Sequence, residues 1–360
     1  MLYPYGNNLK LYIEGGSHDE KIEMFLDGFP AGFQIDADEL LSFMQRRAPG
    51  RNEFSTSRKE GDVPEFLTGV ENSVTQGGRI HAVIRNSNQH SSDYSQVKDI
   101  PRPSHADFAA ISKYGADVDL RGGGHYSGRL TAMLCVAGGL CIQYLKKKGI
   151  EICAHVYSIA DVKDAPFDAV NPDFSALSGK EYPVTDDEAC ERMKAKIAKA
   201  KSEGDSVGGI IECAVTGLEA GMGEHMFAGV EARIASVLFA VPAVKGVEFG
   251  AGFASAGLRG SENNDPFVTD GKKVRTLTNN CGGILGGMTN SMPVVVRAAF
   301  KPTPSIAKEQ QSVSLSKMEN VTFSIKGRHD PCIVFRAVPV VEAVVALAVC
   351  DILSDGGDLR

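Results

Sequence analysis

Apolar and polar residues alternate along several short stretches of the chain, which is the pattern of half-buried strands. Pairs of glycines or other turn residues follow most of these stretches, as after the first one at Gly15-Gly16. Strands are predicted over Leu9–Glu14, Ile22–Leu26, Ile80–Asn86, Gly209–Gly217, Val244–Gly250 and Met292–Phe300.

Helical spacing predicts the remaining elements. Asp36 and Glu39 form a helix start signal before apolar residues, and Thr185 with Glu188 does the same for a helix through Lys201. Three further helices are predicted. Ser127–Lys148 is apolar around nearly its whole surface, and the others are His225–Ala240 and Ala337–Leu353, the last with Pro339 in its first turn. Arg51–Lys59 is polar without periodicity and is interpreted as a mobile loop.

The two halves of the chain share an internal pattern. A strand followed by Gly-x-x-Ala-Gly occurs at Ile22–Gly32 and again at Ile210–Gly221. Each half continues with a strand carrying an arginine, Arg85 or Arg297, and then a buried helix. Two pseudo-equivalent halves are one interpretation, and chance similarity of turn glycines is the other. Either way, the elements predict an α/β or α+β layered fold.

Composition limits the function classes. The 360 residues are 43% hydrophobic and 23% charged, which is typical of a globular protein. A net charge of -7 argues against a nucleic-acid surface. No signal peptide is expected, and Val338–Leu353 is too short and too charged for a membrane span, so no membrane partner is predicted. The 8 cysteines lack a CxxC pair, which favours reduced thiols in a cytoplasm.

Two stretches point to an anionic ligand. Gly327-Arg328-His329-Asp330 places a cation, an imidazole and a carboxylate before an apolar helix, where their desolvation needs compensation. Lys301-Pro302-Thr303-Pro304-Ser305 adds a lysine and two hydroxyls on a rigid loop. There is no Gly-x-Gly-x-x-Gly after the first strand and no P-loop, so neither nucleotide site is supported.

Further candidate motifs each have a simpler alternative. Ser17-His18 follows two glycines and offers a hydroxyl and a proton carrier, or else a solvated surface turn. Arg102–Asp107 joins a cation, an imidazole and a carboxylate, although Ser104 also resembles a helix cap. Gly122–Ser127 suits a phosphate at a helix start, or is a hinge. Asn279–Gly287 could accept a flat ring, or is a tight bend between strands.

A basic cluster surrounds the polar loop. It consists of Arg46, Arg47, Arg51 and Arg58. A solvated charge run is the usual interpretation of such a cluster. The alternative is a basic lid over a highly anionic substrate.

The ordered set of motifs resembles the chorismate synthase family over nearly the full length. The resemblance is carried by Arg102–Asp107, Asp205–Gly209, Pro242–Glu248, Asn279–Gly287, Lys301–Ile306, Gly327–Cys332 and Arg336–Val340. It implies one domain over residues 1–360, a sandwich of antiparallel sheets around long buried helices with pseudo-duplicated halves, and a homotetramer.

The resemblance also implies a reaction. The family converts 5-enolpyruvylshikimate 3-phosphate to chorismate by a 1,4 anti elimination of phosphate and a ring hydrogen. It requires reduced FMN although there is no net redox change. A substrate with two carboxylates and a phosphate calls for arginine and lysine in the site.

Site roles follow from the resemblance, residue by residue. His18, with Ser17, would hold or protonate the leaving phosphate. His105 would place a proton near flavin N1, and Asp330, assisted by Ser127, would act at N5. Flavin contacts would come from His125, Tyr126, Ser127, Pro242, Ala243, Gly286, Lys301, Pro302, Thr303, Pro304, Ser305 and Arg328. Arg47 and Arg51 would face substrate phosphate or NADP, and no metal ligands are predicted.

Several positions depart from the family pattern. Gly16 stands where glutamate is typical, and His125-Tyr126 where Arg-Ser is typical. Histidine also replaces arginine at His90, and asparagine replaces aspartate at Asn88. Glu53 falls at a basic position, and this loss of a basic residue favours an outside source of reduced FMN over self-reduction. Because histidine titrates, phosphate or FMN binding is expected to weaken as pH rises through about 6 to 7. A non-catalytic flavin or phosphate-binding relative is the rival hypothesis, and a different flavin-dependent lyase is a third.

Overall fold

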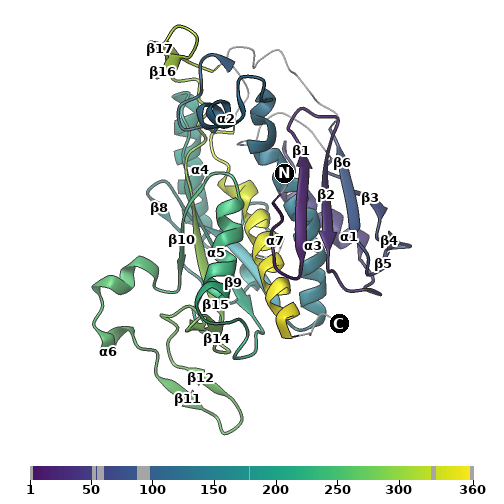
Figure 1. Ribbon diagram of the computed structural model, residues 1–360. Coiled ribbons are helices and arrows are strands. Elements are labelled where there is room, and N and C mark those ends of the chain that lie inside the picture. The colour runs from purple at the N-terminus through teal and green to yellow at the C-terminus, as the bar shows by residue number, and fades with distance from the viewer. Residues whose placement is uncertain are drawn as a thin grey trace.

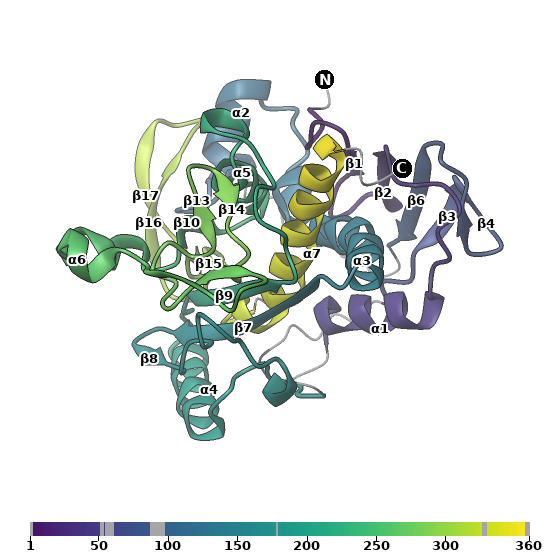
Figure 2. The ribbon, with the colours of Figure 1, turned by 90° about the horizontal axis from the view of Figure 1, so that it is seen from below.

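Two antiparallel sheets enclose a layer of long helices in the computed structural model (Figures 1 and 2). The structure describes residues 3–50, 54, 61–86, 98–177, 179–325 and 330–356. The first sheet has the order β1-β2-β6-β3, with β1 (Lys10–Gly15), β2 (Lys21–Asp27), β3 (Glu65–Thr68) and β6 (Ile80–Arg85). The second has the order β10-β15-β9-β7-β8, with β7 (Glu151–Ile159), β8 (Val162–Lys163), β9 (Gly209–Thr216), β10 (Val244–Phe249) and β15 (Val294–Phe300). The predicted layered α+β sandwich is confirmed.

The α-helices of the described residues are α1 (Ala37–Arg47), α2 (Asp107–Tyr114), α3 (Thr131–Lys147), α4 (Asp187–Ser202), α5 (Val230–Ala240), α6 (Gly260–Asn263) and α7 (Val334–Leu353). Short two-stranded ribbons project from the layers: β4 (Val70–Glu71) with β5 (Val74–Thr75), β11 (Phe267–Thr269) with β12 (Val274–Thr276), β13 (Ile284–Leu285) with β14 (Met288–Thr289), and β16 (Gln310–Ser314) with β17 (Glu319–Phe323).

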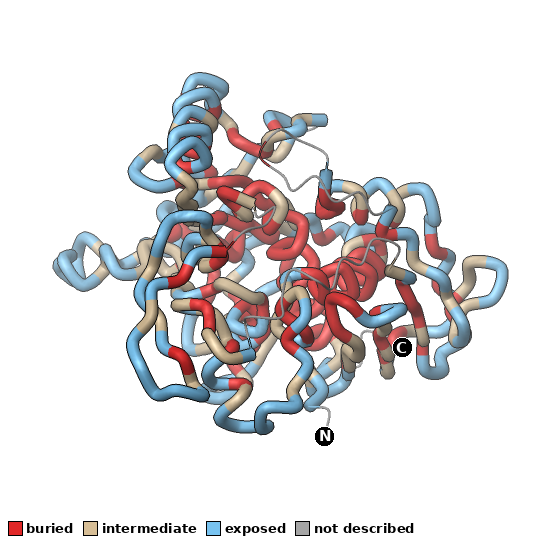
Figure 3. Tube along the Cα trace, turned by 90° about the horizontal axis from the view of Figure 1, so that it is seen from above, coloured by how far each residue is buried: buried red, intermediate tan, exposed pale blue. Residues whose placement is uncertain are grey.

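The core lies where α3 and α7 pack between the sheets, and both helices are buried along almost their whole length (Figure 3). Segments 128–147 and 334–356 are long and apolar enough to span a membrane, but their most apolar windows are 83% and 94% buried within this fold. They are therefore core helices here. The helices approach closely, because a Cβ on Gly138 would lie 2.4 Å from the Cα atom of Ala343.

Charges on the core helix α7 are paired. The Glu342 carboxylate accepts hydrogen bonds from Arg46 Nη1 and Nη2, at 2.6 and 3.0 Å, and from the backbone N–H of Ala154. Asp351 accepts from Arg233 at 2.5 Å and from the backbone before β1. Because an unpaired buried charge is costly, these two carboxylates fix α7 against α1, β7, α5 and the N-terminal segment.

The two halves have the same topology, as the internal pattern predicted. The chain runs β1, β2, α1, β3, β6, α3 in one half and β7, β9, α5, β10, β15, α7 in the other, with equivalent antiparallel pairings. The matching glycines Gly28 and Gly217 both have φ +85°. A Cβ on Gly28 would lie 2.3 Å from the carbonyl oxygen of Asn8, and a Cβ on Gly217 would lie 2.1 Å from the carbonyl oxygen of Gly149. Asn8 and Gly149 each lie just before the first strand of their half.

Several predicted helix ends were wrong. α4 is capped by Asp186, whose side chain accepts from Glu188 N–H, while Thr185 instead bonds Asp164. α5 begins at Val230, because extended backbone at Gly229 separates it from a 3₁₀ turn over Met226–Ala228. α7 begins at Val334, so Pro339 lies inside the helix and not in its first turn. Local cap signals cannot register these tertiary contacts.

Two missed or misassigned elements matter for the core and the site. Strand β7, which lies between β9 and the short edge strand β8, was not predicted, since its residues mix apolar and polar types without alternation. Ser104 does not cap α2; it has φ +62°, and α2 starts at Asp107 without a side-chain cap. The carboxylate of Asp107 has other partners, described below.

Candidate active site

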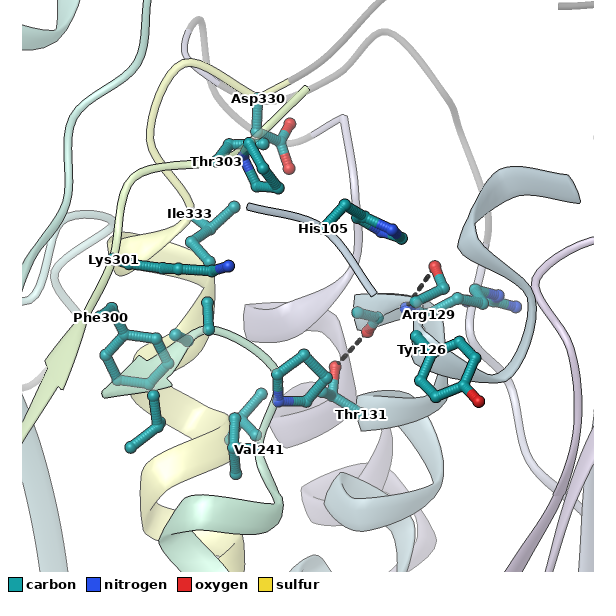
Figure 4. A pocket seen from close by; sticks show the side chains of 18 of the residues that line it. His105, Tyr126, Arg129, Thr131, Val241, Phe300, Lys301, Thr303, Asp330 and Ile333 are labelled. Atoms are coloured by element: carbon teal, nitrogen blue, oxygen red, sulfur yellow. Dashed lines mark hydrogen bonds between the residues drawn. The ribbon is translucent and has the colours of Figure 1, made fainter. Parts of the chain in front are cut away.

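A cavity of about 640 Å³ opens at one end of the helical layer (Figure 4). The segment before α2, the loop leading into α3, the turn before β10, the end of β15 and the start of α7 surround it. Elements from both halves of the chain therefore surround the same cavity. Lys301 extends from the end of β15 toward the space that His105 and Asp330 also border.

His105 is held by a buried carboxylate. Its Nδ1 lies 2.6 Å from Asp107 Oδ1, and Arg102 pairs with the same carboxylate through Nε and Nη2, both at 2.7 Å. Burial opposes ionisation of Asp107, but the hydrogen bonds from Arg102 and His105 hold its pKa well below the usual range. An ionised Asp107 accepts a hydrogen bond from Nδ1–H, so Nε2 of the neutral imidazole of His105 is left as an acceptor.

A glycine loop separates the two predicted histidines. A Cβ on Gly122 would lie 2.4 Å from His18 Cδ2 and 2.8 Å from Ser17 Oγ, while one on Gly123 would lie 3.5 Å from His105 Nε2. Both glycines have positive φ, +60° and +92°, which side chains rarely adopt. Ser17 and His18 are 2% and 8% exposed, so the alternative of a solvated surface turn is wrong.

Asp330 lies at the mouth of α7 and faces the cavity. Its Oδ2 accepts from Arg336 Nη1 at 2.5 Å, and Arg336 Nε donates to the carbonyl oxygen of Arg47 at 3.2 Å. Burial lowers the pKa of Arg336. The ion pair fixes the carboxylate one turn before a helix that carries no other charge near this end.

Arg47 and Arg129 also line the cavity, and both are buried. Arg47 donates to Thr131 Oγ1 at 3.1 Å and to the Gly128 carbonyl at 2.9 Å. Both arginines bond one carboxylate, that of Asp62. The predicted basic cluster thus divides: Arg47 faces this cavity, while Arg46 pairs with Glu342 and lines a different hollow.

The opposite wall is apolar and ends in a cationic edge. Val241, Pro242, Ala243, Phe300 and Ile333 form a continuous apolar surface. Beyond it, Lys301 donates to the Ser104 carbonyl oxygen, and burial together with Lys245 lowers its pKa. Arg102 Nη1 reaches Ser305 Oγ at 3.4 Å and joins this edge to the His105 cluster.

Positive charge dominates the described part of this site. Six cationic side chains line the cavity: Arg47, Arg102, Arg129, Arg336, Lys245 and Lys301. The carboxylates that line it or bond these cations are Asp62, Asp107 and Asp330. The excess of three positive charges favours a ligand with several negative charges.

Most of the predicted site residues meet at this cavity. Those that line it are Arg47, His105, His125, Tyr126, Ser127, Pro242, Ala243, Lys301, Thr303, Pro304, Ser305 and Asp330. Ser17 and His18 lie directly behind Gly122, which lines it. Pro302 is not among the residues that line the cavity. Gly286 and Gly287 form the turn between β13 and β14, which is the tight bend given above as the alternative for Asn279–Gly287. Arg51 and Arg328 lie outside the described residues.

Three contributors were missed at the level of the sequence. Asp62 follows a polar stretch with no periodicity, so nothing indicated that it is fully buried. Arg336 stands in the Arg336–Val340 motif and Arg129 in the predicted helix Ser127–Lys148, but neither was assigned to the site. The signal that could have identified them is the energetic one: an arginine at the start of a buried helix needs a carboxylate or an anionic ligand.

Known proteins resemble this chain over nearly its full length. The family model described as chorismate synthase matches residues 9–353. A chorismate synthase from Lancefieldella parvula is 43% identical, with 98% of this chain and 96% of the relative covered, and one from Thermococcus kodakarensis is 44% identical, with 96% of each covered. A crystal structure of chorismate synthase superposes with a TM-score of 0.76 at 28% identity, covering 98% of this chain and 93% of the other. The chain belongs to the chorismate synthase family.

Proposed function

We propose that this chain is an active lyase that converts 5-enolpyruvylshikimate 3-phosphate to chorismate, with loss of phosphate and a ring hydrogen. The observation that carries the proposal is the meeting of His105, Ser127 and Asp330 in one cavity that has an excess of cations. Two carboxylates and a phosphate give the substrate a charge that this excess complements.

The residues of the cavity fit reduced FMN as the cofactor. A flat ring system can lie against the apolar surface from Val241 to Ala243, and Phe300 extends that surface. Lys301, Thr303 and Ser305 would hold polar edges and the phosphate of the cofactor. When bound, reduced FMN supplies an electron-rich ring that assists loss of phosphate and takes up the ring hydrogen.

The protein's own groups hold protons at defined atoms. His105 can keep a proton on Nδ1 against Asp107 and exchange another at Nε2. Asp330, oriented by Arg336, offers a carboxylate on another side of the same space. His18 lies behind Gly122, where it would stabilise the charge that develops on the leaving phosphate.

The substrate would be held by arginines. Arg47 and Arg129 have fixed guanidinium planes, and planar forks match carboxylate and phosphate oxygens. Rigid cations bind an anion without the entropic cost of ordering flexible side chains. Exclusion of water by the apolar wall strengthens each of these contacts.

The test is an anaerobic assay of the full chain with chemically reduced FMN and 5-enolpyruvylshikimate 3-phosphate. Stoichiometric appearance of chorismate and phosphate is the expected result. No turnover by protein that still binds FMN would instead favour a non-catalytic binding relative. Omitting an external reductant and adding NADPH shows whether the chain reduces its own flavin.

We also propose that the chain works as a cytoplasmic homotetramer. Exposed large apolar side chains on the segments that follow β9 and β10 support an interface, since Phe227, Phe253 and Phe267 are 90%, 84% and 64% exposed. All eight cysteines are free thiols, as in a reducing compartment. Light scattering coupled to size-exclusion chromatography should give the mass of four chains, and a monomer mass would contradict the assembly.

A further inference from the structure

We propose that Asp62 is a positioning residue for substrate binding: its buried carboxylate joins Arg47 to Arg129 and fixes both guanidinium groups at the wall of the cavity. The inference rests on the proposed function for the identity of the anion that these arginines bind. Asp62 itself is not among the residues that line the cavity, so it acts through the two arginines.

The geometry fixes each guanidinium at two or more points. Asp62 Oδ2 accepts from Arg47 Nη1 at 2.5 Å, and Oδ1 accepts from Arg129 Nη1. Arg47 is also held at Nε by Thr131 Oγ1, at 3.1 Å. Arg129 is held at Nε by Asn86 Oδ1, at 2.9 Å. Because a planar guanidinium bonded at Nε and Nη1 cannot rotate, both planes are set before an anion arrives.

The charges explain why one carboxylate is shared. Arg47 and Arg129 are 2% and 6% exposed, and two buried cations side by side would repel strongly in a medium that screens poorly. The Asp62 carboxylate, fully buried between them, sets one negative charge against two positive charges and so removes most of that repulsion. An arriving anion therefore meets a rigid pair of cations whose charge Asp62 neutralises only in part.

The Asp62 carboxyl remains ionised in the folded protein. Burial raises the pKa of the carboxyl, but the charges of Arg47 and Arg129 outweigh that effect and lower it. The backbone of Asp62 is left-handed, with φ +48°, a conformation that aspartate and asparagine tolerate better than most residues. Asparagine at this position therefore keeps the shape and the backbone and removes the charge.

The first experiment compares wild type with Asp62→Asn in steady-state turnover and in FMN titrations. The KM for 5-enolpyruvylshikimate 3-phosphate should rise roughly 10- to 100-fold, as expected for loss of a hydrogen bond to a charged group. The Kd for FMN should stay within about twofold, since Asp62 bonds no residue of the apolar wall. An unchanged KM, or an equal loss of FMN affinity, would overturn the proposal.

Asp27→Asn is the matched control. Asp27 also makes a two-point contact with an arginine, Arg79, at 2.8 and 2.6 Å, but on the exposed side of the first sheet. Its removal should leave kcat and KM unchanged. A KM increase as large as that of Asp62→Asn would show that loss of any such pair acts through general stability, and the proposal would fail.

A double variant tests whether Asp62 acts through Arg129. Arg129→Gln should raise the KM by itself, and adding Asp62→Asn should then raise it by less than in the wild-type background. Fully multiplicative effects would show that Asp62 acts independently of Arg129 and would contradict the proposal.

A second variant covers the case in which Asp62→Asn does not fold. Asn86→Ala removes a further contact of Arg129, at Nε, together with a hydrogen bond to the Asp19 carbonyl oxygen, but it removes no charge. It should raise the substrate KM by a smaller factor at unchanged FMN affinity. If wild type shows no turnover, the proposed function fails, and the role of Asp62 is then measured with inorganic phosphate by calorimetry. Weaker phosphate binding by Asp62→Asn supports the positioning role, and equal binding refutes it.

Discussion

His105 and Asp107 lie 2.6 Å apart, Nδ1 to Oδ1, at the start of α2. The pair fixes the ring so that Nε2 points toward the glycine loop and the cavity, with Gly123 beside it. The carboxylate does not touch the cavity itself, so its contribution to the reaction is the orientation and the tautomer of the imidazole.

Asp107→Asn should therefore lower kcat by about 100-fold, within the range for loss of a positioned acid or base. The amide can donate to Nδ1, which would place the proton on the wrong nitrogen, and Arg102 loses a charged partner. Steady-state turnover at saturating reduced FMN measures the effect, and circular dichroism checks that the variant is folded. A folded variant with kcat within twofold of wild type would refute the assignment.

Gly122→Ala should displace the His18 ring from its position relative to His105. The new Cβ would lie 2.4 Å from the His18 ring, and a shift of about 1 Å in a reacting group can cost on the order of 100-fold in rate. The rate of chorismate formation should fall by at least tenfold. Gly149→Ala is the control: Gly149 has φ +77° but nothing within 4 Å of a new Cβ. It should cost about 1 kcal/mol of stability and leave the rate unchanged; equal rate losses in both variants would contradict the steric explanation.

The sequence predicted the architecture better than the element ends. Strand alternation and apolar helices at Ser127–Lys148 and Ala337–Leu353 were enough for a layered fold, and the repeated Gly-x-x-Ala-Gly located the duplicated topology. β7 was missed because its burial depends on contacts from both faces: Ala154 meets α7, while His155 is covered by the segment after β8. Such contacts leave no period in the sequence.

The candidate site was predicted as far as its motifs extend. His105, Ser127, Lys301 and Asp330 meet as expected, because each lies at the end of an element that points to the same edge of the core. Asp62 could not be identified, since its importance comes from two arginines that are distant in sequence. Gly286 was assigned from its glycine loop and from the resemblance, but it forms the turn between β13 and β14 and is not among the residues that line the cavity.

Stability at alkaline pH should depend on His155. This imidazole is fully buried between Asp164, at 3.0 Å, and Glu212, at 3.2 Å, and Arg297 bonds the far side of Glu212. Burial lowers the pKa of His155, but the hydrogen bonds that it donates to the two carboxylates, and their negative charges, outweigh burial and raise the pKa. The charged form therefore stabilises the fold fully below the unfolded-state value of about 6.5, and this contribution is lost as pH rises through the higher folded-state pKa.

His155→Gln should lower the free energy of unfolding by on the order of 3 kcal/mol at pH 6 and reduce its decline at higher pH. Urea denaturation between pH 6 and pH 9 measures both quantities. His225→Gln, at a 76% exposed side chain, is the control and should change neither. A wild-type stability that does not decline over this range would contradict a buried imidazolium.

FMN affinity should depend on the side chain at position 125. His125 Nδ1 lies 3.0 Å from the Gly15 carbonyl oxygen, which leaves Nε2 for a ligand. The resemblance to the family leads us to expect arginine at this position, and arginine carries a permanent positive charge. His125→Arg should therefore bind the anionic FMN more tightly than wild type in fluorescence titrations. An equal Kd for FMN in the variant and in wild type would dismiss this explanation.

The most direct test of the account is a crystal structure of the full chain with FMN and 5-enolpyruvylshikimate 3-phosphate bound. The account predicts the isoalloxazine ring against Val241–Ala243 and the substrate between that ring and Arg47 and Arg129, with His105 and Asp330 at its edges. Density for either ligand outside this cavity, or a cavity in which His105 and Asp330 contact neither ligand, would contradict it.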